Sequence, residues 1–193
     1  MPVFLLLTCA AFAALDQYIG SLTRFWPTAW QVPALSAPWL LMPFVVGVVA
    51  GRRKHSPVGA ALLGAAATFV ALVGYGLMTI SPIENGPFTL ASFWAFVGSN
   101  VIWFFGGAFS GPVFGLLGHR WAVDRSRLAA ALAAGALLLE PILVAQATIP
   151  LGLVTMTEAA LGVALGGYFW WRRSSATTHP PRPLRLEHVT SAD

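Results

Sequence analysis

Charged side chains are scarce in this sequence. Asp, Glu, Lys and Arg make up 9% of its 193 residues, whereas hydrophobic residues make up 57% and the mean hydropathy is +0.73. So few polar groups cannot cover the surface of a soluble domain, and the composition therefore excludes a soluble globular protein. Cys9 is the single cysteine, which excludes an internal disulfide and any CxxC redox or zinc site.

Basic residues are confined to a few positions. Of the 11 Lys and Arg residues, only Arg24 lies outside three short clusters. The clusters comprise Arg52, Arg53 and Lys54; Arg120, Arg125 and Arg127; and Arg172, Arg173, Arg182 and Arg185. Lys and Arg beside membrane spans stay on the cytoplasmic side, so the pattern predicts cytoplasmic N- and C-termini. Orientation and attraction to anionic lipid headgroups explain the net charge of +4, and nucleic acid is not an expected partner.

Long apolar runs alternate with these clusters and predict an all-α, polytopic membrane helix bundle. A hydrocarbon core of about 30 Å requires roughly 20 helical residues. Six runs meet this requirement, at 2–22, 33–51, 57–80, 89–118, 127–147 and 151–171. We therefore expect a six-span transmembrane domain over 1–171. The polar, Pro-rich segment 172–193 is expected to be a disordered cytoplasmic tail.

The first run has an alternative interpretation as a cleaved signal peptide. Residues 11–13 read Ala-Phe-Ala, which mimics a cleavage site with small residues. No basic residue precedes the run, however, so we favour a retained first span.

Two of the expected spans contain helix-breaking residues. The second carries Pro33, Pro38 and Pro43, which predict a kinked or unwound outer half. The fourth, at 89–118, is too long to cross the bilayer upright. We expect it to tilt strongly or to break at Gly111-Pro112.

Glycines recur at four-residue spacing in the fourth run, at Gly107, Gly111 and Gly115. Such a stripe lets helix backbones approach closely in lipid. Close packing within the chain is the favoured interpretation, and a dimer interface is the alternative.

Tryptophans gather near the expected membrane interfaces, as in an aromatic belt. Trp26, Trp30, Trp39 and Trp94 fall near the outer side, and Trp121, Trp170 and Trp171 near the inner side. Trp103 is left near mid-bilayer, where we expect ordinary helix packing.

Polar residues within the runs are candidates for a substrate-binding site, because polar groups are costly in hydrocarbon. The candidates are Asp16, Tyr75, Asn100, Glu140 and Glu158. The acids fall in the outer half, on stripes of small residues that turn them toward other helices. The short connection 148–150 makes the last two helices neighbours. We hypothesise that Glu140 and Glu158 there recognise a cationic or hydrogen-bond-donating solute. The alternative is that the acids only fix helix packing.

Catalysis has little support in the sequence. Ser110 precedes Gly111 in the fourth run, which resembles the serine of rhomboid-type intramembrane proteases. The glycine-x-serine-glycine pattern is absent, and no sixth-span histidine is present to act as a base. The four histidines show no metal-ligand spacing. We therefore expect neither an enzyme nor a cofactor.

Several short motifs over about 36–121 resemble a family of actinobacterial six-span proteins known as a domain of unknown function. The motifs are at 36–41, which reads Ser-Ala-Pro-Trp-Leu-Leu, at 72–75, which reads Leu-Val-Gly-Tyr, and at 111–115 and 118–121. This resemblance implies a bacterial inner-membrane protein and transfers no activity. The first and last spans match only loosely, so it does not support Asp16 or Glu158 as site residues.

The expected architecture is also similar to the substrate-binding subunits of energy-coupling-factor vitamin transporters. Those subunits have six helices with both ends inside, a site in the outer half and an Ala-x-x-x-Ala face for a partner. Ala10, Ala14 and the segment 23–36, as a lid, would correspond here. The sequence thus predicts a solute-binding or transport-type protein, with a membrane partner or a homo-oligomer as possible assemblies. The alternative is a non-transporting structural or sensory membrane protein.

Overall fold

The computed structural model describes the backbone of residues 2–33, 35, 37–146 and 153–177, and their side chains except those of 140–146, 153–155 and 172–177. Within these ranges the chain is helical and has no strand. The elements are α1 (Pro2–Ser21), η1 (Leu22–Arg24), η2 (Ala29–Gln31), α2 (Ala37–Arg52), α3 (Pro57–Thr79), η3 (Pro82–Glu84), α4 (Leu90–Ser99), α5 (Val101–Asp124), α6 (Arg127–Gln146) and α7 (Leu153–Thr177).

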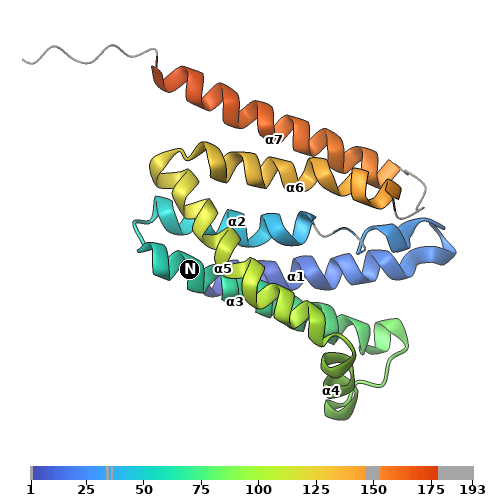
Figure 1. Cartoon of the computed structure of the whole chain (residues 1–193). Helices are drawn as coiled ribbons and strands as arrows, with labels where there is room; N and C mark the ends of the chain where they lie inside the picture. Colours follow the sequence, from blue (N-terminus) through green and yellow to red (C-terminus); the bar gives the residue numbers. More distant parts are fainter. Residues whose placement is uncertain (1, 34, 36, 147–152, 178–193) are drawn as a thin grey trace, which may run out of the picture.

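The long helices run back and forth, and their connections gather alternately at two opposite ends of the bundle (Figure 1). The connections α2–α3 and α5–α6 lie at one end, and α1–α2 and α3–α4 at the other. Arg52, Arg53, Lys54, Arg125 and Arg127 therefore fall at a common end.

Three of the described helical segments are long and apolar enough to cross a membrane: Pro2–Arg24, Pro57–Thr79 and Val101–Asp124. The helices Ala37–Arg52 and Leu90–Ser99 are apolar but shorter, as is the segment Arg127–Leu139. The molecule is thus an all-helical membrane protein, as the composition predicts. At a rise of about 1.5 Å per residue, α2 is roughly 24 Å long, somewhat less than a typical hydrocarbon core.

Local sequence signals fix several helix boundaries. The hydroxyl of Ser56 accepts a hydrogen bond from the Gly59 N–H at 3.1 Å, and Pro57 occupies the first turn of α3. After α3, Asn85 adopts a left-handed conformation with φ of 57°, and the Gly86 N–H donates to the Ser81 carbonyl. Asn and Gly are the residues that tolerate such a tight turn between two helices.

The fourth apolar run does not break where the sequence suggested. Pro112 lies inside α5, and the break falls at Asn100, which separates α4 from α5. There the Ser99 hydroxyl donates to the Ala95 carbonyl and the Asn100 side-chain amide donates to the Phe96 carbonyl, both at 2.9 Å. These bonds give the last turn of α4 side-chain donors from Ser99 and Asn100, and the Asn100 backbone N–H also donates to the carbonyls of Phe96 and Val97, which helps the helix to end inside an apolar run. Figure 1 shows α4 turned away from the axis of α5.

The centre of the bundle is built on close contact between α5 and the helices α2 and α3. Gly107, Gly111 and Gly115 are all buried. A Cβ atom on Gly111 would lie 2.9 Å from the Gly64 carbonyl oxygen of α3. A Cβ on Gly47 of α2 would collide with the carbonyl of Gly115. The glycine stripe therefore serves packing within the chain, as the favoured interpretation predicts.

The hairpin of α6 and α7 joins this centre through aromatic contacts. The rings of Trp121 in α5 and Phe169 in α7 lie 4.3 Å apart between centroids, and Phe44 of α2 contacts the same phenyl ring at 6.2 Å. The guanidinium of Arg125 lies 5.4 Å from the Trp121 ring centroid. Trp121 is thus buried in the bundle and is not part of an interfacial belt. The helix α7 continues past residue 171, and the remaining tail, 178–193, lies outside the described residues.

Candidate functional site

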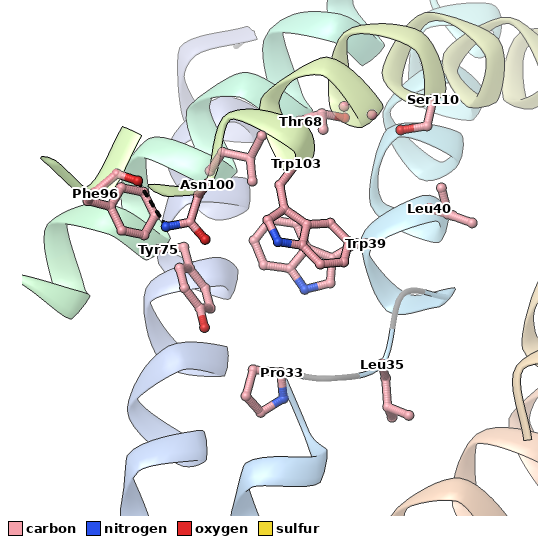
Figure 2. Close-up of a pocket in the computed structure, with 13 residues that line it drawn as sticks. Pro33, Leu35, Trp39, Leu40, Thr68, Tyr75, Phe96, Asn100, Trp103 and Ser110 are labelled. Atoms are coloured by element: carbon pink, nitrogen blue, oxygen red, sulfur yellow. Dashed lines mark hydrogen bonds between the residues drawn. The ribbon is translucent and has the colours of Figure 1, made fainter. Parts of the chain in front are cut away.

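A cavity of about 390 Å³ lies among α2, α3, α4 and α5, in the half of the bundle that holds the α1–α2 and α3–α4 connections. Figure 2 shows the side chains around it. Its lining is formed by Pro33, Leu35, Trp39, Leu40, Thr68, Leu72, Tyr75, Phe96, Asn100, Trp103, Gly106, Gly107 and Ser110. A volume of this size is at the lower end of the range for small-molecule sites, about 300–1,000 Å³.

Irregular backbone creates the room for this cavity. The helix α2 starts only at Ala37, so Pro33 and Leu35 approach from outside the helix. The expected unwinding is thus limited to the residues before Ala37, and Pro38 and Pro43 lie within α2. The break before α5 turns Asn100 toward α3. Gly106 has no atom within 4 Å of the position a Cβ would occupy, which leaves one wall open.

Aromatic rings form most of the wall. Trp39 and Tyr75 meet edge to face with centroids 5.8 Å apart, and Tyr75 contacts Phe96 at 6.2 Å. Trp103 adds a fourth ring from α5. Edge-to-face packing fixes the orientation of Trp39 and Tyr75 relative to each other, so this part of the wall is preformed.

Polar groups are few and come from different helices. The Asn100 amide nitrogen donates to the Phe96 carbonyl, and Figure 2 shows its amide oxygen on the side of Trp39 and Tyr75. The Thr68 hydroxyl donates to the Gly64 carbonyl of its own helix at 3.1 Å. A mostly apolar cavity with a few convergent polar atoms is typical of ligand sites.

Asp16 lies directly behind this wall. The Trp39 indole N–H donates to its carboxyl oxygen at 3.2 Å. The side chain of Asp16 is buried, although Asp16 does not itself line the cavity. No Lys, Arg or His in the described part of the chain forms a salt bridge with it. The carboxyl thus contributes its charge and its hydrogen bond through the indole.

The five residues expected from the sequence are distributed unevenly. Tyr75 and Asn100 line one cavity, and Asp16 contacts a third lining residue, Trp39. Glu158 is buried on α7, whose main packing partner is α6, and it is not among the lining residues. The side chain of Glu140 lies outside the described residues.

For two tryptophans that line the cavity, the sequence pattern predicted other roles. Trp39 was placed in the outer aromatic belt, but its indole is turned inward, to Asp16 and Tyr75. Trp103 was expected to pack between helices, but it is 63% exposed and lines the cavity. The position of Trp103 at mid-bilayer depth, away from both expected belts, was the signal that could have indicated its role.

Catalytic and metal-binding groups do not converge here. Ser110 is a lining residue, and no acid or histidine lines the cavity beside it. His119 lies toward the opposite end of α5, where its Nε2 hydrogen-bonds to the His55 carbonyl at 2.9 Å. Within the described residues, no three His, Cys, Asp or Glu side chains are grouped as a metal site would need.

No protein-family model, curated protein or solved structure matches this chain.

Proposed function

We propose that the chain is a six-span integral membrane protein that binds a small solute in the cavity among α2, α3, α4 and α5, as part of a transport-type function. The observation that carries the proposal is the aromatic cavity of about 390 Å³, with Asn100 and Tyr75 at its wall. Intramembrane polar groups beside irregular helix ends are typical of solute sites in transporters.

The number of spans and their orientation are supported by the arrangement of the connections. The short helix α2 and the helices α6 and α7 would complete six crossings with the three long segments. Basic residues fall at the end with the α2–α3 and α5–α6 connections. The positive-inside rule then places both termini in the cytoplasm and the cavity in the outer half. The proposed location is a bacterial inner membrane.

A structural or sensory membrane protein is the second candidate. It is favoured by the glycine stripe, because Gly111 and Gly115 are fully explained by packing against α3. The partner in either case is the lipid bilayer, with a coupling protein or a second copy as possible assemblies. The two candidates differ in whether the cavity holds a solute.

Native mass spectrometry of gently extracted protein tests for a bound solute. We expect a small molecule to accompany the parent protein and to be lost in Gly106→Leu. The leucine side chain can enter open space at the cavity wall without a clash. Gly98→Leu is the matched control, because Gly98 also has no atom near its Cβ position and does not line the cavity.

Parent protein without any bound molecule, or full retention in Gly106→Leu, would remove the support for solute binding. Loss of the molecule in Gly98→Leu as well would show a general effect of the substitution, and the cavity would not be its site. The result that supports solute binding in this cavity is loss of the molecule in Gly106→Leu together with its retention in Gly98→Leu.

A further inference from the structure

The aromatic wall presents π-electron faces and edges from four rings around one space. Trp39, Tyr75, Phe96 and Trp103 come from four different helices, and the lining contains no charged residue. The face of an aromatic ring carries negative quadrupolar potential and attracts cations, most strongly for tryptophan. Cages of this kind recognise quaternary ammonium groups.

The distribution of charged residues along the chain also favours a cation at the cavity. The half of the bundle with the cavity and its adjoining connections contains, by sequence position, Asp16, Glu84, Glu140 and Glu158, and only Arg24 as a base. The opposite end and the segment after α7 carry the other basic residues. Such an asymmetry creates a potential that concentrates cations at the cavity end and attracts anions to the basic end.

Asp16 adds a local contribution to this potential. Its buried carboxyl group accepts the Trp39 indole N–H. A hydrogen bond to a negative acceptor makes the indole ring more electron-rich. A buried carboxylate with one neutral donor is also costly, and a cation on the far side of the indole would lower that cost.

We propose that the cavity takes an organic cation, with a quaternary ammonium group against the aromatic wall and apolar substituents along the rest of the lining. This inference rests on the proposed solute-binding function and names its substrate class. Quaternary ammonium groups donate no hydrogen bonds, which suits a wall with few polar atoms. The leucines and glycines of the lining accommodate the apolar substituents.

Choline and 3,3-dimethylbutan-1-ol are the probes for this inference. They have nearly the same shape, but carbon replaces the ammonium nitrogen in the second compound. Titration calorimetry with the purified full chain should give binding of choline about tenfold tighter than of the neutral isostere, because a desolvated cation–π contact is worth about 1–2 kcal/mol.

Four variants test whether this preference for choline depends on Trp103 and Asp16. Trp103→Leu should lower choline affinity about tenfold and leave the isostere unaffected, whereas Trp103→Phe should lose less. Trp94→Leu is the control, because Trp94 is 62% exposed, against 63% for Trp103, and does not line the cavity. Asp16→Asn keeps the acceptor for Trp39 and removes the charge, so it should weaken only choline binding.

The outcomes separate the two proposals. Equal binding of the two probes would overturn the cation preference and leave solute binding in place. If neither probe binds but a co-purified molecule is still present in the parent protein, the cation preference is overturned and solute binding remains in place. Absence of both probe binding and a co-purified molecule would overturn both proposals. Equal losses in Trp103→Leu and Trp94→Leu would place the cation elsewhere than in this cavity.

Discussion

Trp39 of α2 donates its indole N–H to the carboxyl group of Asp16 in α1, at 3.2 Å. This hydrogen bond links two helices that are consecutive in the chain, and it holds the indole edge away from the cavity that its ring lines. A residue 23 positions earlier in the chain thus holds one of the wall residues of the candidate site in place.

The first prediction concerns the stability that this bond provides. Asp16→Leu leaves the Trp39 N–H without its acceptor, so it should lower the free energy of unfolding by about 1–3 kcal/mol. Asp16→Asn offers an amide oxygen in its place and should lose less. Thermal unfolding of the detergent-purified variants measures the difference, and equal midpoints for Asn and Leu would show that the bond contributes nothing.

The second prediction concerns the glycine stripe. Gly111→Leu places a side chain against Thr68 and the Gly64 carbonyl, so we expect a loss of about 1–3 kcal/mol or more. At Gly106, five residues earlier in the same helix, an added Cβ would have no atom within 4 Å, so Gly106→Leu should keep the melting temperature of the parent protein. If both variants melt alike, the close approach of α5 to α3 is not needed for stability.

The third prediction concerns the attachment of the α6–α7 hairpin. Phe169→Ala removes the ring that packs on Trp121 and Phe44, and it should cost about 1–3 kcal/mol. The cost is lower than in a soluble core, because lipid is as apolar as the protein interior and only packing is lost. Phe109→Ala is the control, since Phe109 is exposed on α5. The rate of limited proteolysis and the melting temperature should both change in Phe169→Ala and stay unchanged in Phe109→Ala.

The fourth prediction concerns orientation. In a Cys9→Ala background, Ile83→Cys should react in intact cells with a membrane-impermeant maleimide, because Ile83 is exposed in the α3–α4 connection. Arg53→Cys, in the α2–α3 connection, should react only after the membrane is permeabilised. The reverse pattern would invert the proposed topology.

The helix positions were accessible from the sequence because each is encoded locally. The segment 57–80 was expected as a span, and α3 runs over Pro57–Thr79, since Ser56 and Pro57 form a cap whose chemistry depends on adjacent residues. The break at Asn100 was missed because hydropathy continues through it. It depends on side-chain hydrogen bonds from Ser99 and Asn100 to the preceding turn, and these leave no trace in an apolar pattern.

The candidate site could be predicted only in part, because it depends on how helices pack and not on local sequence alone. Tyr75 and Asn100 stand out as polar groups in apolar runs, and both line the cavity. The role of Trp39 depends on how α1 and α2 pack, and a tryptophan near a helix end has the same sequence signature in a belt as in a cavity wall. Depth along the chain placed Glu158 in the same half of the bundle, but it could not specify which helices α7 contacts.

The direct backbone contacts of α5 also constrain how the cavity can open. Added Cβ atoms at Gly47, Gly64 and Gly118 would collide with backbone of the neighbouring helix, so α2, α3 and α5 have no layer of side chains on which to slide. These three helices form one rigid frame. A change in access to the cavity would then have to come from the elements at its margin, α4 and the segment that includes η2 and Pro33, while the aromatic wall on α2 and α3 keeps its shape.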